Sequence, residues 1–376
     1  MSGSEMRPSP YARYLLLGAT LFLSVGGLLM IYSASFAKDF IDTGNSYNHV
    51  EHQALFLLIG LAVMLFAMRM PTSLVRRLAW PVLIGSDLLL AYVFVAGVGK
   101  WGATRWINLG FTTLQPSEFA KLGCVLVVAE IIANRARDPR APLQPDLIKG
   151  AFAVLVPFAF VMLQPDMGTA MSILIAVFIV LFLGGLPSAY IAGAAGVAAV
   201  ALPALIMLKS YRAERFLSFL NPSSDPLGSG YQILQARLAF GSGGILGLGL
   251  GMSRQKYLYL PAAHTDFIFA IIGEELGLLG SAAVVGGFAV LGYAGTRLAL
   301  SCKDLYSRLV AAGLTAMIVT QALINMGSVT GLMPVTGVPL PLVSYGGSSL
   351  VFTMGCIGLI IGVTNDRRAV RAPARG

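Results

Sequence analysis

Ten apolar runs recur along this chain, each close to the length that crosses a bilayer as a helix. Only 11% of the 376 residues are charged, whereas soluble domains carry about 25%. We therefore predict an all-α polytopic membrane protein that forms a single domain over residues 1–376. The runs cover residues 14–36, 53–69, 79–99, 115–133, 149–163, 166–185, 188–208, 266–295, 307–329 and 343–364.

The lysine and arginine residues predict the orientation of these spans. Short cytoplasmic loops accumulate positive charge, and the net charge of +9 is mostly distributed in this way, so it does not indicate a nucleic acid partner. We predict that both termini are cytoplasmic, because the opposite short loops hold only Lys38, Lys100 and Arg105. The predicted cytoplasmic segments hold Arg7, Arg13, Arg69, Arg76, Arg77, Arg135, Arg137, Arg140, Lys149, Arg297, Lys303, Arg308, Arg367, Arg368, Arg371 and Arg375.

A long loop, residues 209–265, joins the seventh and eighth spans on the predicted outer side. Long loops determine topology only weakly, so its positive charge does not overturn the orientation. The charges indicate either an ordinary solvated loop or a basic surface for a phosphate-bearing ligand, and composition does not separate the two. Residues 230–240 have the pattern of a short interfacial helix. The basic residues are Lys209, Arg212, Arg215, Arg237, Arg254 and Lys256.

Several familiar site types are not supported. The run GSGGILGLGLG lacks the lysine of a phosphate-binding loop, so we reject a nucleotide site and expect no organic cofactor. The three cysteines have no metal-ligand spacing, and a disulfide framework is not expected. His49 and His52 flank Glu51 in an early loop, but no third ligand candidate lies nearby to complete a metal site. The first ten residues are polar and do not resemble a cleavable signal.

Residues 256–280 carry three carboxylates in or beside a membrane span, where charges are costly and usually functional. Asp266 falls in the predicted first turn of that span, where unpaired N–H groups favour an ionised carboxylate. It is either a general base at a water-facing boundary or a helix cap. Glu274 falls about 80° around the helix from Asp266 and Glu275 about 180°. We predict that Glu275 is a structural partner for a buried donor.

Five polar segments meet on the predicted outer side, namely residues 102–108, 115–121, 164–169, 256–275 and 330–349. Glu118 and Lys121 share one helix face, as a neutralising ion pair or as a pair that leaves Lys121 for an anionic ligand. Glu118 lies two positions after Pro116 and Asp166 directly follows Pro165, so both are also candidate helix caps. Asp87 has no visible role. These patterns predict an anionic, phosphate-linked substrate at the outer face, with enzyme and transporter both open.

The motifs GATRWINLG, QPSEFAK, QPDMGTA, GSGGILGLGLG, HTDFIFAIIGEELG and PLPLVSYGGSSL occur here in this order. In this arrangement the chain resembles the SEDS family of shape, elongation, division and sporulation proteins over nearly its whole length. The stretch SRQKYLYLPAAHTDFIFAIIGEELGL is more similar to the division branch than to the elongation branch, and the sporulation branch stays open. Ala262-Ala263 departs from a Pro-Glu pair that is common in the family.

The resemblance implies a peptidoglycan glycosyltransferase that polymerises lipid II at the outer face of the bacterial cytoplasmic membrane, at the division septum. The family's essential aspartate matches Asp266, which would take a proton from the acceptor hydroxyl so that it attacks the donor with inversion. The diphosphate leaving group would need cations, from Lys121, Arg105, Arg254 and Lys256 or from a divalent Mg or Mn ion. Further substrate-binding candidates are Glu118, Gln115, Ser117, Asp166, His264, Thr265, Ser344, Tyr345, Gly346, Gly347 and Ser348.

The implied partners are a class B penicillin-binding protein of the FtsI type, which crosslinks the new glycan, and other division proteins. Two alternatives have different signatures. A lipid II flippase would use membrane carboxylates and Lys121 to pass the headgroup, and would also show a polar inner vestibule. A division scaffold would need no catalytic residues. The placement of most polar groups on the predicted outer side favours the enzyme.

Overall fold

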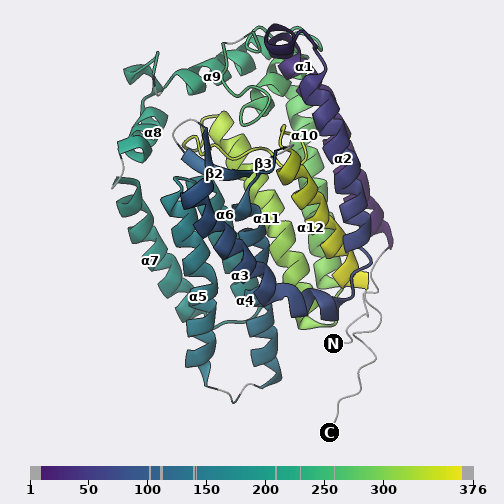
Figure 1. Ribbon diagram of the computed structural model, residues 1–376, viewed down its shortest axis with the longest axis vertical. Coiled ribbons are helices and arrows are strands. Elements are labelled where there is room, and N and C mark those ends of the chain that lie inside the picture. Colours follow the sequence, from purple (N-terminus) through teal and green to yellow (C-terminus); the bar gives the residue numbers. More distant parts are fainter. Residues whose placement is uncertain are drawn as a thin grey trace.

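The computed structural model describes residues 10–100, 103–110, 113–138, 140, 142–207, 210–228, 230–257 and 259–365. Long helices run side by side, and shorter helices and loops cross one end of the bundle (Figure 1). A helix overlaps each of the ten predicted spans. These helices are α1 (Pro10–Thr43), α2 (Asn48–Ala67), α3 (Thr72–Ala96), α4 (Pro116–Arg137), α5 (Leu143–Leu163), α6 (Met167–Leu183), α7 (Ser188–Met207), α10 (Ile268–Leu300), α11 (Leu305–Val329) and α12 (Gly347–Asn365).

Seven helices among the described residues are long and apolar enough to cross a membrane: α1, α2, α3, α5, α10, α11 and α12. Helix α6 is apolar but has only 17 residues. Helix α4 carries Glu118, Lys121 and Glu130 among its apolar residues. The structure confirms a polytopic helical membrane protein, while the number of ten crossings and the orientation stay predictions.

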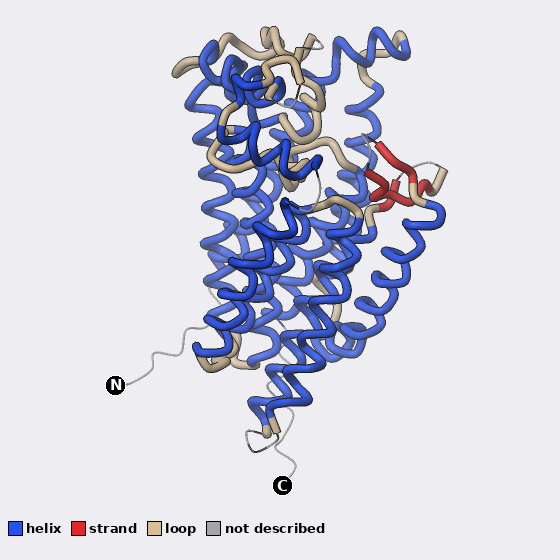
Figure 2. Tube along the Cα trace, turned by 90° about the vertical axis from the view of Figure 1, so that its left-hand side faces the viewer, coloured by secondary structure: helices blue, strands red, loops and turns tan. Residues whose placement is uncertain are grey.

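The prediction of an all-α chain is wrong at one place, between α3 and α4. Strands β1 (Val98–Lys100), β2 (Ala103–Asn108) and β3 (Thr113–Leu114) form an antiparallel sheet in the order β1-β2-β3. Figure 2 shows this sheet beside the helices, near the end of the bundle where the loops gather. Thr104, Trp106 and Ile107 are β-branched or aromatic residues that favour strands. Short connections suffice to pair antiparallel strands, so the segment between Ala96 and Pro116 can form all three.

The long loop is partly helical, with α8 (Ser210–Leu220), a 3₁₀ turn η1 (Pro222–Ser224) and α9 (Tyr231–Gly243). Helix α9 confirms the helix predicted at residues 230–240, whereas α8 was not predicted. Of the basic residues named in the sequence analysis, Arg7, Lys209, Arg367, Arg368, Arg371 and Arg375 lie outside the described residues, as does Gly102 of the GATRWIN motif.

Helix α10 is interrupted at Gly277, whose φ of 65° and ψ of −159° require a residue without a side chain. The glycine-rich run after α9 replaces the helical hydrogen bonds that this break removes. The N–H of Leu248 donates to the carbonyl of Glu274 at 2.9 Å, and the N–H of Leu278 donates to that of Gly244 at 3.0 Å. The run is therefore a structural segment fixed to α10, because buried backbone groups need such partners.

The polar segments gather at one end of the molecule. Helices α4, α6, α10 and α12 all begin at the end that carries the sheet, α8 and α9, and α1 begins at the opposite end, where α12 also ends (Figure 1). Helices α11 and α12 are the most enclosed of the seven candidate spans, with 72% and 78% of their apolar windows buried. The predicted convergence of the five polar segments is thereby confirmed as a spatial arrangement.

Candidate active site

Asp266 lies in the turn that precedes α10, against the loop that joins α11 to α12. The side chain of Asn325 on α11 donates from Nδ2 to the backbone carbonyls of Asp266 and Val338, both at 2.8 Å. In that loop Gly337 has a φ of +71°, which favours glycine. A Cβ on Gly337 would lie 3.6 Å from Asp266 Oδ2, 3.7 Å from Arg105 Nη1 and 3.7 Å from Arg215 Nη1. One carboxylate and two guanidinium groups therefore surround a single backbone position.

The electrostatic surroundings of Asp266 suit a proton acceptor. Burial raises the pKa of its carboxyl to about 6, although Arg105 and Arg215 lower it and Asp166 raises it further. A base with this pKa is mostly ionised at neutral pH and still binds a proton with useful strength. Asp266 is also not the N-cap residue of α10, which is Phe267.

Arg105 reaches the site from β2, the strand that the sequence analysis missed. Its Nε donates to the carbonyl of Gln164 at 3.2 Å, and its Nη2 donates to that of Pro165. Its Nη1 lies 3.8 Å from Asp166 Oδ1. The sheet and the α5–α6 turn together fix the guanidinium, so Arg105 is a pre-oriented cation.

Asp166 caps α6, as the sequence analysis predicted among its alternatives. Its carboxylate accepts the backbone N–H of Thr169 at 3.2 Å and the Thr169 hydroxyl at 2.9 Å. Gln115, the residue before α4, donates to the same carboxylate at 3.2 Å. Asp166 therefore ties the starts of α4 and α6 together and orients Arg105.

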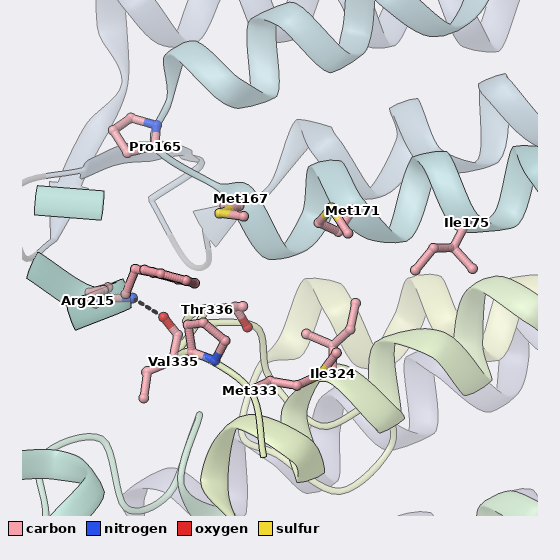
Figure 3. Close-up of a pocket in the computed structure, with 11 residues that line it drawn as sticks. Pro165, Met167, Met171, Ile175, Arg215, Ile324, Met333, Val335 and Thr336 are labelled. Carbon is pink, nitrogen blue, oxygen red and sulfur yellow. Dashed lines mark hydrogen bonds between the residues drawn. The ribbon is translucent and has the colours of Figure 1, made fainter. Parts of the chain in front are cut away.

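Arg215 is the site residue that sequence reasoning did not distinguish. It lies on α8, is partly exposed, and donates from Nη1 to the carbonyl of Val335 at 3.0 Å (Figure 3). The sequence presents it only as one of several basic residues in the long loop. Its position follows from the way α8 packs over the 330–346 loop, which local pattern does not reveal.

An apolar cavity adjoins these charges. Arg215 and Pro165 line one end of it and Ile175 the other, along α6 (Figure 3). Met167, Met171 and Ile175 are four residues apart and therefore share one face of α6. The remaining wall comes from Phe216, Ile324 and residues 333–336. An apolar cavity with a cation at one end suits a ligand that has an anionic head and a hydrocarbon tail.

Glu118 and Lys121 form the predicted ion pair on α4. Lys121 Nζ lies 3.0 Å from Glu118 Oε1 and donates to Gln321 Oε1 at 2.6 Å, and both charged side chains are buried. Within the described part of the chain, Glu118 Oε2 and Ser117 Oγ are buried without a hydrogen-bond partner. The direct contact of Lys121 with a ligand stays a prediction.

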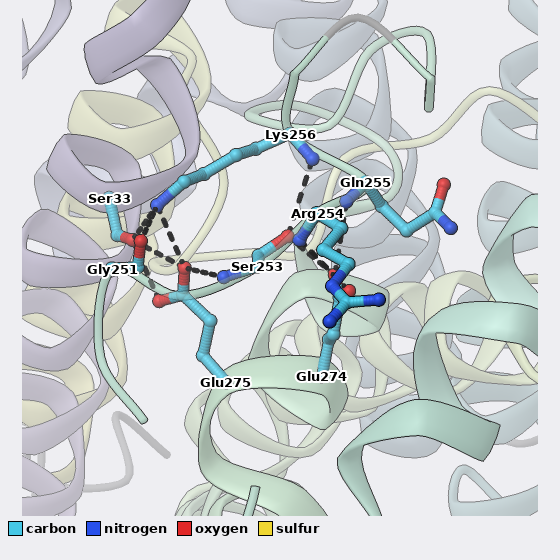
Figure 4. A network of polar contacts seen from close by, with 8 residues as sticks. All are labelled: Ser33, Gly251, Ser253, Arg254, Gln255, Lys256, Glu274 and Glu275. Carbon is cyan, nitrogen blue, oxygen red and sulfur yellow. Dashed lines mark hydrogen bonds and ion pairs between the residues drawn. The ribbon is translucent and has the colours of Figure 1, made fainter. Parts of the chain in front are cut away.

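Lys256 belongs to a different network, built on the second turn of α10 (Figure 4). Its Nζ lies 3.2 Å from Glu275 Oε1, and the hydroxyl of Ser33 donates to both oxygens of Glu275 at 2.7 Å. This confirms Glu275 as the structural partner of a buried donor. Glu274 accepts the backbone N–H of Arg254 at 3.0 Å, while the side chain of Arg254 is exposed.

The remaining predicted residues lie in the loop before α12 or at the start of that helix, and two of them hold the turn that carries Asp266. The hydroxyl of Ser344 donates to the carbonyl of Thr265 at 2.6 Å, and the N–H of Tyr345 donates to that of His264 at 2.9 Å. Gly346 donates its N–H to Gln53 Oε1 at 3.2 Å. Gly347 and Ser348 begin α12, where a side chain on Gly347 would collide with Phe56.

The described residues offer no ready ligand set for a divalent cation. No group of three or more His, Cys, Asp or Glu side chains in the described part of the chain is arranged to hold a metal. Asp166 and Asp266, the carboxylates of the site, face arginines instead. In the HVEH run, His49 contacts Asp39 and His52 is exposed.

Known proteins match this chain along nearly all of its length. The family model described as cell cycle protein, covering FtsW, RodA and SpoVE, matches residues 13–369. A probable peptidoglycan glycosyltransferase FtsW of Trichlorobacter lovleyi is 38% identical over 365 residues, covering 95% of each chain. Stage V sporulation protein E of Bacillus subtilis is also 38% identical, covering 94% of this chain and 97% of its own.

Solved structures agree with these sequence matches. A chain from a peptidoglycan synthase complex, described as coordinating polymerization and crosslinking, superposes with a TM-score of 0.77 at 31% identity, covering 96% of this chain and 99% of that one. The rod shape determining protein RodA of Thermus thermophilus superposes with a TM-score of 0.70 at 31% identity, covering 94% and 96%.

Proposed function

The chain belongs to the FtsW, RodA and SpoVE family of cell cycle proteins, and from this premise we propose that it is a peptidoglycan glycosyltransferase. It polymerises lipid II into glycan strands at the outer face of the cytoplasmic membrane, with Asp266 as the general base. The relatives named FtsW support a role in division at the septum.

The observation that supports this proposal most directly is the position of Asp266. Its carboxylate lies with Arg105 and Arg215 around Gly337, next to the apolar cavity that Arg215 and Pro165 line. Lipid II joins a disaccharide to a polyprenyl chain through a diphosphate. The carboxylate, the arginines and the cavity provide complementary surroundings for the reacting sugar, the diphosphate and the start of the polyprenyl chain, respectively.

The reaction follows from this arrangement. Asp266 accepts the proton of the acceptor sugar hydroxyl, and the oxygen attacks the anomeric carbon of the donor as the bond to the diphosphate breaks. Attack opposite the leaving group inverts that carbon. Arg105 and Arg215 stabilise the negative charge that develops on the departing undecaprenyl diphosphate, because planar guanidinium groups pair well with phosphate oxygens.

The family resemblance allows a divalent cation, but the residues around Asp266 do not fit one, so no step is assigned to it. Chelation of Mg and Mn in the polymerisation assay tests whether the reaction needs a divalent cation.

The resemblance also supports a class B penicillin-binding protein as the partner, as does the match to a synthase complex described as coordinating polymerization and crosslinking.

The deciding experiment is polymerisation of labelled lipid II by the purified chain in detergent, with and without an FtsI-type partner. We expect glycan chains from the wild type and a loss of about 10²-fold or more in Asp266→Asn, the size of a general-base contribution. Glu214→Gln on α8, an exposed carboxylate, is the matched control and should retain full activity. Detergent removes the two sides of a membrane, so a transporter or a scaffold would make no product in this assay. The absence of glycan from the wild type would therefore favour transport or scaffolding.

A further inference from the structure

The connection between α1 and α2 contacts the turn that carries Asp266. His49, near the start of α2, bonds through Nδ1 to the carboxylate of Asp39, which is only 1% exposed. The same carboxylate accepts the backbone N–H of His49 and the hydroxyl of Ser35, both at 3.0 Å. A carboxylate in this position fixes the proton on Nδ1 and the orientation of the ring.

The oriented ring packs against two residues next to the catalytic centre. Its centroid lies 4.7 Å from that of His264 and 4.6 Å from that of Tyr345, with both pairs inclined at 64°. His264 and Tyr345 also contact each other at 5.9 Å. Edge-to-face ring pairs at these distances are favourable, so His49 holds both partners in place.

The partners of His49 are coupled to Asp266 through the backbone. Tyr345 donates its N–H to the carbonyl of His264 at 2.9 Å, two residues before Asp266. Gln53, one turn beyond His49 on α2, donates to the carbonyl of Ser344 at 3.3 Å. Helix α2 therefore contacts the 344–346 loop through His49 and Gln53, and that loop is hydrogen-bonded to the turn that carries Asp266.

We propose that the Asp39–His49 pair is a positioning device for the catalytic aspartate. This inference rests on the proposed function. His49 acts through His264 and Tyr345, and its removal lets the turn move away from Arg105 and Arg215. A displacement of about 1 Å at a reacting group can cost about 10²-fold in rate, so a remote ring can matter.

The test measures kcat and KM for lipid II polymerisation by the full chain. We expect His49→Ala to lower kcat about tenfold, with KM within about twofold, because positioning affects the reacting geometry more than ground-state binding. His52→Ala is the matched control, since His52 is exposed and lies on the same helix three residues further on. It should leave both constants unchanged.

A double-mutant cycle separates positioning from a general loss of structure. Asp266→Glu shifts the carboxylate by one methylene group and so disturbs the same geometry directly. If His49 acts by positioning Asp266, the effects of His49→Ala and Asp266→Glu are not additive. If His49→Ala does not fold, His49→Asn carries the same test, because its amide can still donate to Asp39 while the ring is absent.

The possible results are distinct. A folded His49 variant with wild-type kcat overturns the positioning role, as does a change confined to KM or full additivity in the cycle. Equal losses in His49→Ala and His52→Ala overturn it too. A wild type that makes no glycan overturns the proposed function and this inference together, so that failure is recognisable before any variant is made.

Discussion

Two charged regions flank the first two turns of α10 and differ in how their carboxylates are held. Glu274 and Glu275 are buried and surrounded by donors, including the Ser33 hydroxyl, the Lys256 ammonium and the N–H of Arg254. Asp266 instead lies beside two arginines that do not offset its burial, so its pKa is raised to about 6. Asp266 and Glu274 are only eight residues apart in the sequence.

The contrast separates a structural pair of carboxylates from the proposed general base. A buried carboxylate with several fixed donors holds its neighbours in place. A carboxylate that burial keeps near its titration point can exchange a proton, at some expense in stability. The glutamates therefore fasten the 251–256 segment to α10, whereas Asp266 fits the general-base role proposed for it.

The largest expected effect is a loss of stability when the Lys256–Glu275 ion pair is broken. Glu275→Leu leaves the buried ammonium of Lys256 without its counter-charge, which should lower the free energy of unfolding by about 3–5 kcal/mol. Thermal unfolding in detergent measures the loss. Asp266→Asn, in contrast, should not lower the unfolding temperature, because it removes a charge that burial disfavours.

A compensating variant checks the cause of that loss. Glu275→Leu combined with Lys256→Met removes both charges and should recover most of the stability, since apolar pairs replace buried ion pairs well. An unfolding temperature for Glu275→Leu within one or two degrees of the wild type would contradict the structural assignment of this network.

The next effect concerns Arg215 and the titration of Asp266. Wild-type polymerisation should rise with pH through about 6, the pKa of Asp266, as the base ionises. Arg215 lowers that pKa, so Arg215→Ala should move the rise to higher pH. Activity at pH 7 should fall about 10- to 100-fold, as expected for a lost contact between charged groups.

The pH–rate profile distinguishes this role from simple damage. Arg215→Lys restores the charge and should return the rise toward pH 6, but not the full rate, because an ammonium lacks the planar fork of guanidinium. An acid limb of Arg215→Ala that stays at the wild-type position would remove Arg215 from the electrostatics of the site.

The helical part of the fold could be predicted because each span is a long run of apolar residues in the sequence. The sheet could not, since strands such as Thr113–Leu114 are too short to show a periodic pattern. The break at Gly277 also needed the structure, because it depends on hydrogen bonds from the distant run around Gly244 and Leu248.

The site was predictable in proportion to how unusual each residue is in its own segment. Asp266 stands out as a charge at the edge of an apolar span. Arg215 does not stand out, because it is one of several basic residues in its loop. Only the packing of α8 against Val335 brings its side chain to the site. The role of His49 depends on contacts with Asp39 and His264, from three separate segments, which no local pattern records.

A smaller effect is expected from filling the space beside Gly337, which Asp266, Arg105 and Arg215 surround. Gly337 and Gly44 both have a φ of +71°, but a side chain on Gly44 would meet nothing within 4 Å. Alanine at either position should cost about 1–2 kcal/mol of backbone strain. Only Gly337→Ala places a methyl group between Asp266 and the arginines, so it alone should lower polymerisation, by about fivefold to tenfold. Equal activity in the two variants would show that this space is not used.

The smallest expected effect concerns Arg254, a predicted phosphate ligand that lies in the structural region. Its backbone N–H is held by Glu274, while its side chain is exposed. Exposed charges contribute about 0–1 kcal/mol, so Arg254→Ala should raise KM less than about fivefold. The difference should fade as salt is added, because salt screens exposed charges. KM measured for the wild type and Arg254→Ala at low and high ionic strength gives the size of the rise and its dependence on salt.

Arg237→Ala on α9 is the control for a general effect of basic charge, because Arg237 is also exposed. If Arg254→Ala lowered kcat as much as Arg215→Ala, Arg254 would have to reach the reacting groups during turnover. The segment that Glu274 and Glu275 fasten would then be part of the active site, and the distinction between the two regions would no longer hold. A weak, salt-sensitive effect in both exposed arginines would instead leave Arg105 and Arg215 as the cations that serve the diphosphate.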